Sequence, residues 1–315
     1  MSVPRGNRAT MACNASLAIA LHSGCPASQW HDRVSRLLAS RLLTSNDRLT
    51  YINVGANKGY NVADVLQRYH SHGIGPRSSE AWHQALLKTK VHGMRVRYGC
   101  GLCNPCRQPP PKVQLHVPLE VHAIEMVDVN AQALRALFRF FEVPGRVWHA
   151  AASNFSGTAT YVAATAVGLE HHELWKGVSR LVRTTTLDEF AAANLRPTQT
   201  IDVLSIDTEG QDALILEGAR QLLSARRIAV LEFEFIARGF WRKDHAEQRL
   251  LRPVLQSLEA NGYRCFWQGE ARTTGGRLAR ASGKHWCDAF QFRHRSNLVC
   301  SHVPEVLKVF ESLSV

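Results

Sequence analysis

Apolar positions along the chain recur with two different periods, and the changes between them divide the sequence into strands and helices. Residues 49–54 form a short β-branched and aromatic run, which predicts a buried strand. The next apolar residues recur at i, i+3, i+4 and i+7, as on one face of a helix: Val62, Val65, Leu66 and Tyr69. This strand-to-helix pair is the best-defined unit of the sequence.

The same alternation continues through most of the chain. Strand composition predicts seven strands, at 49–54, 119–125, 146–151, 201–206, 228–235, 263–267 and 288–293. Helical periodicity predicts helices at 28–43, 60–69, 130–141, 186–190, 212–223 and 251–258, and 157–163 is predicted to be a strand extension or hairpin. Strands that alternate with helices predict an α/β fold, a doubly wound and mostly parallel sheet with helices on both faces.

One interval breaks this alternation. In a compact βαβ unit the second strand follows the first helix within a few residues, but here it begins at Leu119. We therefore predict a basic, Cys- and His-rich insertion at 70–118 within a domain that spans 28–270. Residues 271–315 are expected to complete the domain with a strand and a tail.

Charge and hydropathy restrict the class of protein. The net charge is +12 at pH 7, and its excess falls on segments 67–119 and 264–295. Basic segments of this kind suit nucleic acid, a phosphorylated or sulfated substrate or an anionic membrane face, and a solvated surface without a partner is the alternative. No apolar run reaches eighteen residues, so no transmembrane helix is predicted.

The amino-terminal segment lacks the features of a secretory signal. Residues 1–27 contain a weakly apolar stretch at 11–21 with no clear cleavage site after it. We expect a disordered start, with a targeting peptide as the alternative interpretation. This favours a cytoplasmic or organellar protein over a secreted one.

Three cysteines are clustered inside the predicted insertion. Cys100, Cys103 and Cys106 have the C-x₂-C-x₂-C spacing that lets thiolates share one ion. A fourth zinc ligand would have to come from His92, His116 or Cys25. An iron–sulfur cluster would need a cysteine where Pro110 stands. Structural zinc is therefore one interpretation, and free thiols or a surface disulfide are the other.

Chemically useful residues gather where the predicted strands end. The first strand runs into Asn53-Val54-Gly55-Ala56-Asn57-Lys58-Gly59, a glycine turn whose spacing matches neither the dinucleotide fingerprint nor the phosphate loop. Glu125 ends the second strand, where a carboxylate can accept both hydroxyl protons of a ribose. Asp207 and Glu209 follow the strand 201–206. Ligands bind beyond the carboxyl ends of such strands, so we expect these residues to converge.

These segments together resemble one family. Tyr51–Gly59, Ala123–Glu125 with Asn130, Thr186–Asp188 and Val203–Gly210 with Leu216–Gly218 are similar to the motifs of the FkbM methyltransferases, in order and with the family spacing apart from the insertion. The similarity covers 49–66 and 119–236. It implies a Rossmann-like class I methyltransferase fold, S-adenosylmethionine as cofactor and, usually, methylation of a hydroxyl.

The resemblance also implies roles for individual positions. Glu125 would hold the ribose, Ser153 and Asn154 would lie beside the adenine, and Asp207, Glu209 and Gly210 would face the methyl-transfer site. The methionine part of the cofactor would be held by Asn53, Gly55, Ala56, Asn57 and Gly59, and Asp207 also counts among the cofactor contacts.

Three positions depart from the family pattern. Asn53 stands where the family has an acid, which weakens an ionic contact with the cofactor ammonium. Ser205 stands where the family often has lysine, so a catalytic lysine is not expected. Ser153-Asn154 stands where an aspartate is frequent, which leaves adenine contacts to the backbone.

The expected reaction is in-line transfer to the oxygen of a small molecule, sugar or glycan. Positioning of the acceptor contributes up to ~7–11 kcal/mol and a general base about 10²–10⁴-fold. Asp207 or Glu209 is the expected base, with three histidines as alternatives: His149, His171 and His172. The absence of an Asp/Asn-Pro-Pro-Tyr motif disfavours methylation of nucleobase amines.

Two other functions remain open. A nicotinamide dinucleotide enzyme is disfavoured, because the glycine spacing is wrong. A catalytically degenerate methyltransferase fold would instead bind nucleic acid or another anion through the basic insertion and tail.

Overall fold

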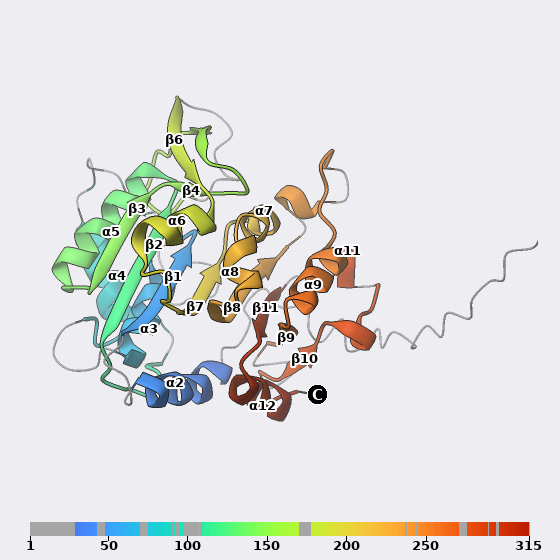
Figure 1. Cartoon of the computed structure of the whole chain (residues 1–315). Coiled ribbons are helices and arrows are strands. Elements are labelled where there is room, and N and C mark those ends of the chain that lie inside the picture. The colour runs from blue at the N-terminus through green and yellow to red at the C-terminus, as the bar shows by residue number, and fades with distance from the viewer. Residues whose placement is uncertain are drawn as a thin grey trace, which may run out of the picture.

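The computed structural model describes residues 29–42, 48–69, 75–89, 91, 93, 95–96, 107, 109–169, 178–236, 238–242, 245–270, 276–288, 290–293 and 296–314. Within these ranges a large sheet forms the centre of the molecule, with helices packed on both of its faces (Figure 1). Its strand order is β10-β9-β11-β8-β7-β1-β2-β3. The α/β fold predicted from the sequence is confirmed.

Five adjacent strands, which end at the β3 edge of the sheet, are parallel. They are β1 (Leu49–Val54), β2 (Leu119–Glu125), β3 (Gly145–His149), β7 (Ile201–Ile206) and β8 (Ile228–Phe235). β1 lies between β2 and β7, with Asn53 opposite Ala123 on one side and Ser205 on the other. This register brings the carboxyl ends of β1, β2 and β7 to one edge of the sheet.

Three strands complete the sheet with antiparallel pairings: β9 (Arg264–Gln268), β10 (Leu278–Arg280) and β11 (Ser296–Ser301). Among the described residues the sheet thus has eight strands rather than seven, because β10 adds an edge. The predicted strand at 288–293 is wrong, since this segment contains the short helix α11 (Phe290–Arg293). Gln291 explains the difference: its side-chain oxygen accepts the Leu251 N–H at 2.8 Å and so caps another helix.

A small second sheet stands beyond the carboxyl ends of β1, β2 and β3 (Figure 1). It consists of β4 (Ala151–Ala152), β5 (Gly157–Val162) and β6 (Ser179–Thr185). The predicted third strand at 146–151 is therefore divided: β3 stays in the large sheet and β4 pairs with β6. The hairpin expected around 157–163 is present as β5 and β6.

The helices are α2 (Gln29–Leu42), α3 (Tyr60–Tyr69), α4 (Ser79–Lys88), α5 (Asp128–Phe140), α6 (Leu187–Asn194), α7 (Asp212–Glu217), α8 (Arg220–Ser224), α9 (Leu251–Ala260) and α12 (Pro304–Ser312), with 3₁₀ turns η3 (Gly239–Trp241) and η4 (Gly283–His285). The predicted helix at 212–223 is broken after Glu217. A Cβ at Gly218 would lie 2.1 Å from the Ser153 carbonyl oxygen, so the chain turns there against the Ser153 backbone.

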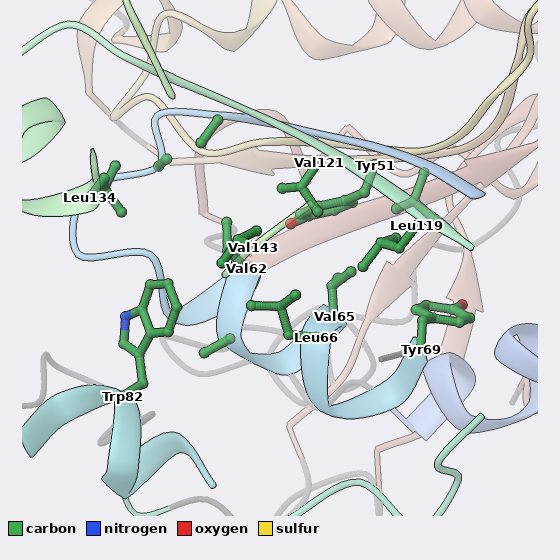
Figure 2. Close-up of a cluster of buried hydrophobic side chains, with 14 of the residues drawn as sticks. Tyr51, Val62, Val65, Leu66, Tyr69, Trp82, Leu119, Val121, Leu134 and Val143 are labelled. Atoms are coloured by element: carbon green, nitrogen blue, oxygen red, sulfur yellow. The ribbon is translucent and has the colours of Figure 1, made fainter. Parts of the chain in front are cut away.

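Alternate side chains of the strands feed two separate hydrophobic cores. Tyr51 and Val121 point to one face, where they pack with Val65 and Leu66 of α3 (Figure 2). Ile52 and Val54 point to the other face, towards the residues of α6 to α9. Burial on both faces is typical of a parallel sheet and explains why these strands read as continuous apolar runs.

The predicted insertion is partly structured. Ser78 caps α4 by accepting the Ala81 N–H at 3.1 Å, and Trp82, Ala85 and Leu86 are buried in the core beside α3 and α5. This helix was not predicted, although the cap and the i, i+3, i+4 spacing were visible. Cys100, Cys103, Cys106, His92, Cys25 and residues 1–27 lie outside the described residues. His116 is among the described residues.

Two further features concern cysteines and membranes. Cys265 of β9 and Cys300 of β11 form a disulfide between paired strands. Within the described part of the chain no helix is both long and apolar enough to span a membrane.

Candidate functional site

The glycine corner between β1 and α3 is held in an unusual backbone conformation. Gly55, Asn57 and Gly59 all have positive φ angles, of 79°, 44° and 77°. A Cβ on Gly55 would lie 1.9 Å from the carbonyl oxygen of Asp207. Gly55 is therefore required for the close approach of the loop after β1 to the loop after β7. The sequence had indicated only a role in ligand binding.

Gly59 has a packing role, against helices rather than against the strand. A Cβ there would lie 2.6 Å from Leu134 Cδ2 and 2.7 Å from Trp82 Cζ2. The start of α3 thus fits between α5 and α4. Ala56 is buried beside these glycines, and its carbonyl accepts the Gly59 N–H at 2.7 Å, which closes the turn.

Glu125 lies directly beside this corner. Its Oε2 accepts the backbone N–H of Asn57 at 2.7 Å, and its Oε1 accepts that of Val127 at 2.8 Å. Burial raises the pKa of Glu125, while these hydrogen bonds act in the opposite direction. The Asn130 side chain and the Met126 N–H also hydrogen-bond this carboxylate, so Glu125 is oriented by four donors around it.

Asn53 is fully buried at the end of β1, and among the described residues neither its amide nitrogen nor its oxygen has a hydrogen-bond partner. Leaving such a group unpaired costs roughly 1–3 kcal/mol. Ser205, its neighbour on β7, hydrogen-bonds the hydroxyl of Tyr51 instead. The unpaired amide of Asn53 is available to a ligand group or to water.

Acidic side chains gather at the ends of β7 and β8. One carboxylate oxygen each from Asp207, Glu209 and Glu234 lies within 4.8 Å of the others. Glu209 adopts a φ of 54° and pairs with Arg238. The spacing could hold a cation, but the Arg238 guanidinium already supplies positive charge to Glu209.

Asp212 lies beneath this group at the start of α7 and is completely buried. Its Oδ1 accepts the Glu234 N–H at 3.1 Å, and its Oδ2 lies 3.0 Å from the Thr208 hydroxyl. Burial, reinforced by the charge of Asp207, raises the pKa of Asp212 to about 8. Asp212 therefore accepts hydrogen bonds from the Thr208 hydroxyl and the Glu234 N–H, while its raised pKa favours the protonated form near neutral pH.

The expected adenine residues lie further along. Ser153 is buried, and the Asn154 amide donates to Glu217 at 2.9 Å. Residues that the sequence did not single out lie nearer to Glu125: Ala150 donates its N–H to the Glu125 carbonyl at 3.2 Å, and the carbonyl of Met126 lies 3.0 Å from His149 Nε2.

The structure therefore brings together most of the predicted site. Asn53, Gly55, Asn57 and Glu125, which were predicted to hold the cofactor, lie together, and Gly55 lies against Asp207, which begins the acidic group. His171 and His172 lie outside the described residues. Glu234 and Arg238 were missed by the sequence analysis. The one local signal was the alternation Glu232-Phe233-Glu234 in an otherwise apolar strand, and it marks Glu234 alone.

Comparison with known proteins matches residues 53–265 to the methyltransferase FkbM domain. No curated protein matches the chain. Among solved structures, the chain is similar to the N-terminal domain of human METTL16 in complex with SAH (10% identity, 86% of this chain, 68% of that chain, TM-score 0.33). It is also similar to an SAM-dependent methyltransferase from Agrobacterium tumefaciens (10% identity, 88% and 63%, TM-score 0.34).

The chain spans only part of some of these relatives. It covers 65% of a METTL16 methyltransferase domain, with 10% identity, 86% of this chain matched and a TM-score of 0.35. It covers 39% of the bifunctional kinase-methyltransferase WbdD, with 10% identity, 87% of this chain matched and a TM-score of 0.35.

Proposed function

Because the chain belongs to the FkbM methyltransferase family, and so is an S-adenosylmethionine-dependent methyltransferase, we propose that it methylates a hydroxyl of a small molecule, sugar or glycan. One observation carries the proposal. The register of β1 with β2 and β7 places the glycine corner, Glu125 and Asp207 at a single edge of the sheet. A cofactor contact and a proton acceptor are therefore available at the same place.

The residues at the end of β1 and β2 fit the cofactor. The unpaired amide of Asn53 offers both a donor and an acceptor to the methionine part, without the charge of the family's usual acid. Backbone groups of Gly55, Ala56, Asn57 and Gly59 would complete this contact, and Glu125 would hold the ribose hydroxyls. When bound, the cofactor supplies an electrophilic methyl group on its sulfonium.

The adenine contacts are the least supported part of the proposal. The Asn154 amide is engaged by Glu217, so its side chain would have to leave that bond to reach a ligand. Ser153 directly follows β4 and is buried. Because Met126 and Ala150 lie next to Glu125, they are stronger candidates for the residues beside the adenine.

Asp207 is the better of the two proposed bases. Glu209 is paired with Arg238, so its carboxylate is already engaged by a guanidinium. Asp207 begins the loop after β7, where its backbone N–H is fixed by the Val54 carbonyl at 3.0 Å. In this proposal Asp207 takes the proton of the acceptor hydroxyl, and Arg238 with Glu209 shapes the mouth of the acceptor side.

The charge of the acceptor side favours a small hydroxyl substrate over nucleic acid. Three carboxylates and the buried Asp212 lie at the ends of β7 and β8. A phosphate backbone would be repelled there, whereas a neutral or cationic acceptor would not. The degenerate, anion-binding alternative would instead use the basic insertion and tail.

Calorimetric titration with S-adenosylhomocysteine tests the cofactor half of the proposal. We expect micromolar binding by the wild-type protein, and a screen of hydroxyl acceptors with labelled S-adenosylmethionine then tests the reaction. A folded protein that binds no S-adenosylhomocysteine, but shows a salt-dependent shift with RNA or DNA, would support the degenerate alternative instead.

A further inference from the structure

The insertion contacts the glycine corner through a buried side chain of α4. Trp82 of α4 is completely buried, and its Nε1 donates to the Lys58 carbonyl at 2.8 Å. Lys58 lies between Asn57 and Gly59, inside the turn that we assign to the methionine part of the cofactor. A residue of the insertion thus bonds directly to the backbone of the cofactor side.

The ring of Trp82 also fixes the position of the elements around this turn. Figure 2 shows the indole extending from α4 towards Val62 of α3 and Leu134 of α5. It stacks on Phe141, just after α5, with ring centroids 5.2 Å apart and planes 11° apart. In this stacked position the indole directs its N–H towards the Lys58 carbonyl.

The next residue of α4 makes a second contact with the start of α3. The hydroxyl of Tyr60 lies 2.6 Å from His83 Nδ1. Burial, with the charges of Lys58 and Arg107, lowers the pKa of His83, although Glu80 acts in the opposite direction. In a neutral ring, Nδ1 can accept a hydrogen bond from the Tyr60 hydroxyl.

The returning part of the insertion holds the other end of the same helix. Leu115 donates its N–H to the Arg68 carbonyl at 2.6 Å, and Val117 donates to that of Tyr69 at 3.1 Å. The insertion therefore contacts α3 at its first and its last turn. The glycine corner cannot shift relative to β1 without disturbing the contacts of α4.

We propose that α4 is a positioning element for the cofactor, in which Trp82 holds the Lys58 carbonyl and so keeps the Ala56–Gly59 backbone in its binding conformation. The inference rests on the proposed cofactor site. In this proposal the insertion contributes to cofactor binding through α4. Trp82 touches no cofactor atom itself, and its effect is exerted through the turn.

The test compares Trp82→Phe with a matched substitution elsewhere. Trp82→Phe keeps an aromatic ring in the core but removes the bond to Lys58. Trp30→Phe removes an equivalent buried bond, from Nε1 to Gln268 Oε1 at 3.1 Å, on α2, which packs against α12 and β1. Both variants lose a buried hydrogen bond, so we expect similar falls in melting temperature.

Binding and exchange separate positioning from stability. In titrations with S-adenosylhomocysteine we expect the Kd of Trp82→Phe to rise about tenfold and that of Trp30→Phe to stay within twofold, which a net loss of one hydrogen bond would allow. In the protein without cofactor, we expect faster hydrogen exchange at residues 56–60 for Trp82→Phe alone. Equal Kd values for the two variants overturn the proposal.

Two further outcomes are informative. If Trp82→Phe does not fold, Tyr60→Phe takes its place: it loses the bond to His83, and we expect a two- to fivefold rise in Kd, whereas an unchanged Kd counts against the proposal. If the wild-type protein binds no S-adenosylhomocysteine, the proposed function fails. Faster exchange at 56–60 would then show a structural contact only, and α4 would have no role in cofactor binding.

Discussion

The cofactor side and the acceptor side of the site are built in different ways. On the cofactor side, Asn53–Gly59 and Glu125 interact mainly through backbone groups, in a turn that two glycines make possible. On the acceptor side, Asp207, Glu209 and Glu234 interact through ionisable side chains drawn from two strands. The first side depends on shape and the second on charge, so substitutions on each should fail in different ways.

Gly55→Ala should have the largest effect, because Gly55 is where the two sides meet. The new Cβ would lie 1.9 Å from the Asp207 carbonyl oxygen, so one loop must move. Together with strain at a positive φ we expect a loss of roughly 3–4 kcal/mol, or about 10 °C in melting temperature, measured by calorimetry.

Gly93→Ala is the matched control for this substitution. Gly93 has a similar φ of 69°, but a Cβ there would have nothing within 4 Å. Only the strain remains, so we expect a loss of about 1 kcal/mol. Equal losses in the two variants would show that the contact between the loops is unimportant.

Asp207→Asn tests the charge of the acceptor side. If Asp207 takes the acceptor proton, the rate of methyl transfer should fall about 10²–10⁴-fold. Cofactor affinity should change little, because Asn keeps the shape of the loop. Single-turnover transfer to an acceptor found by the screen measures the rate.

Glu209→Gln is the appropriate comparison, since it also removes one negative charge, two residues further along the same loop. It breaks the pair with Arg238 and should slow transfer by less than tenfold. A greater loss for Glu209→Gln than for Asp207→Asn would reverse our assignment of the base.

The difference between the two sides also explains what the sequence could predict. The cofactor side lies within short segments: the strand at 49–54, the glycine turn and Glu125 were all placed correctly, because local periodicity and turn chemistry determine them. The doubly wound fold followed from the alternation of strands and helices. The insertion did not disturb it, since β2 still pairs with β1.

The acceptor side depends on contacts between distant segments, which a single sequence does not display. Glu234 and Arg238 reach Glu209 only because β8 pairs with β7 and the chain turns back at η3. The last strand was misplaced for a similar reason. Residues 288–293 alternate like a strand, but Gln291 is used to cap α9, and the pairing falls to 296–301. Tertiary contacts outweighed local pattern in both places.

Glu125→Ala should weaken the cofactor side without changing the acceptor side. Hydrogen bonds to a charged group contribute about 1.5–3 kcal/mol each, so losing the ribose contacts should raise the Kd for S-adenosylhomocysteine by roughly 10²-fold. Because burial raises the pKa of Glu125, wild-type affinity should also fall at a higher pH on acidification than an exposed glutamate would allow.

Glu120→Ala provides the control for calorimetric titration. Glu120 lies at the opposite end of the same strand, where it accepts the side-chain N–H of Gln199 at 3.0 Å. We expect its cofactor affinity to stay within about twofold of the wild type. Similar weakening by both substitutions would mean that β2 stability, rather than the Glu125 carboxylate, controls binding.

Asp212→Asn should have the smallest effect and a distinctive pH dependence. The folded-state pKa of Asp212 is raised to about 8, whereas in the unfolded chain it is about 3.9. The unfolded state therefore loses this proton first, and stability is lost as the pH rises from about 4 to about 8. Asparagine cannot ionise, and its amide can still donate to Thr208 and accept from the Glu234 N–H.

Asp212→Asn should thus melt close to the wild type at about pH 3, where Asp212 is protonated in both states, and clearly above it near pH 8, where the unfolded state has lost the proton. Calorimetry at several pH values measures this difference, with the exposed Asp288→Asn as a control that should show none. A difference that does not grow with pH would mean that Asp212 is ionised in the folded protein. The acceptor side would then carry one more negative charge, and a cationic group would be needed to balance it.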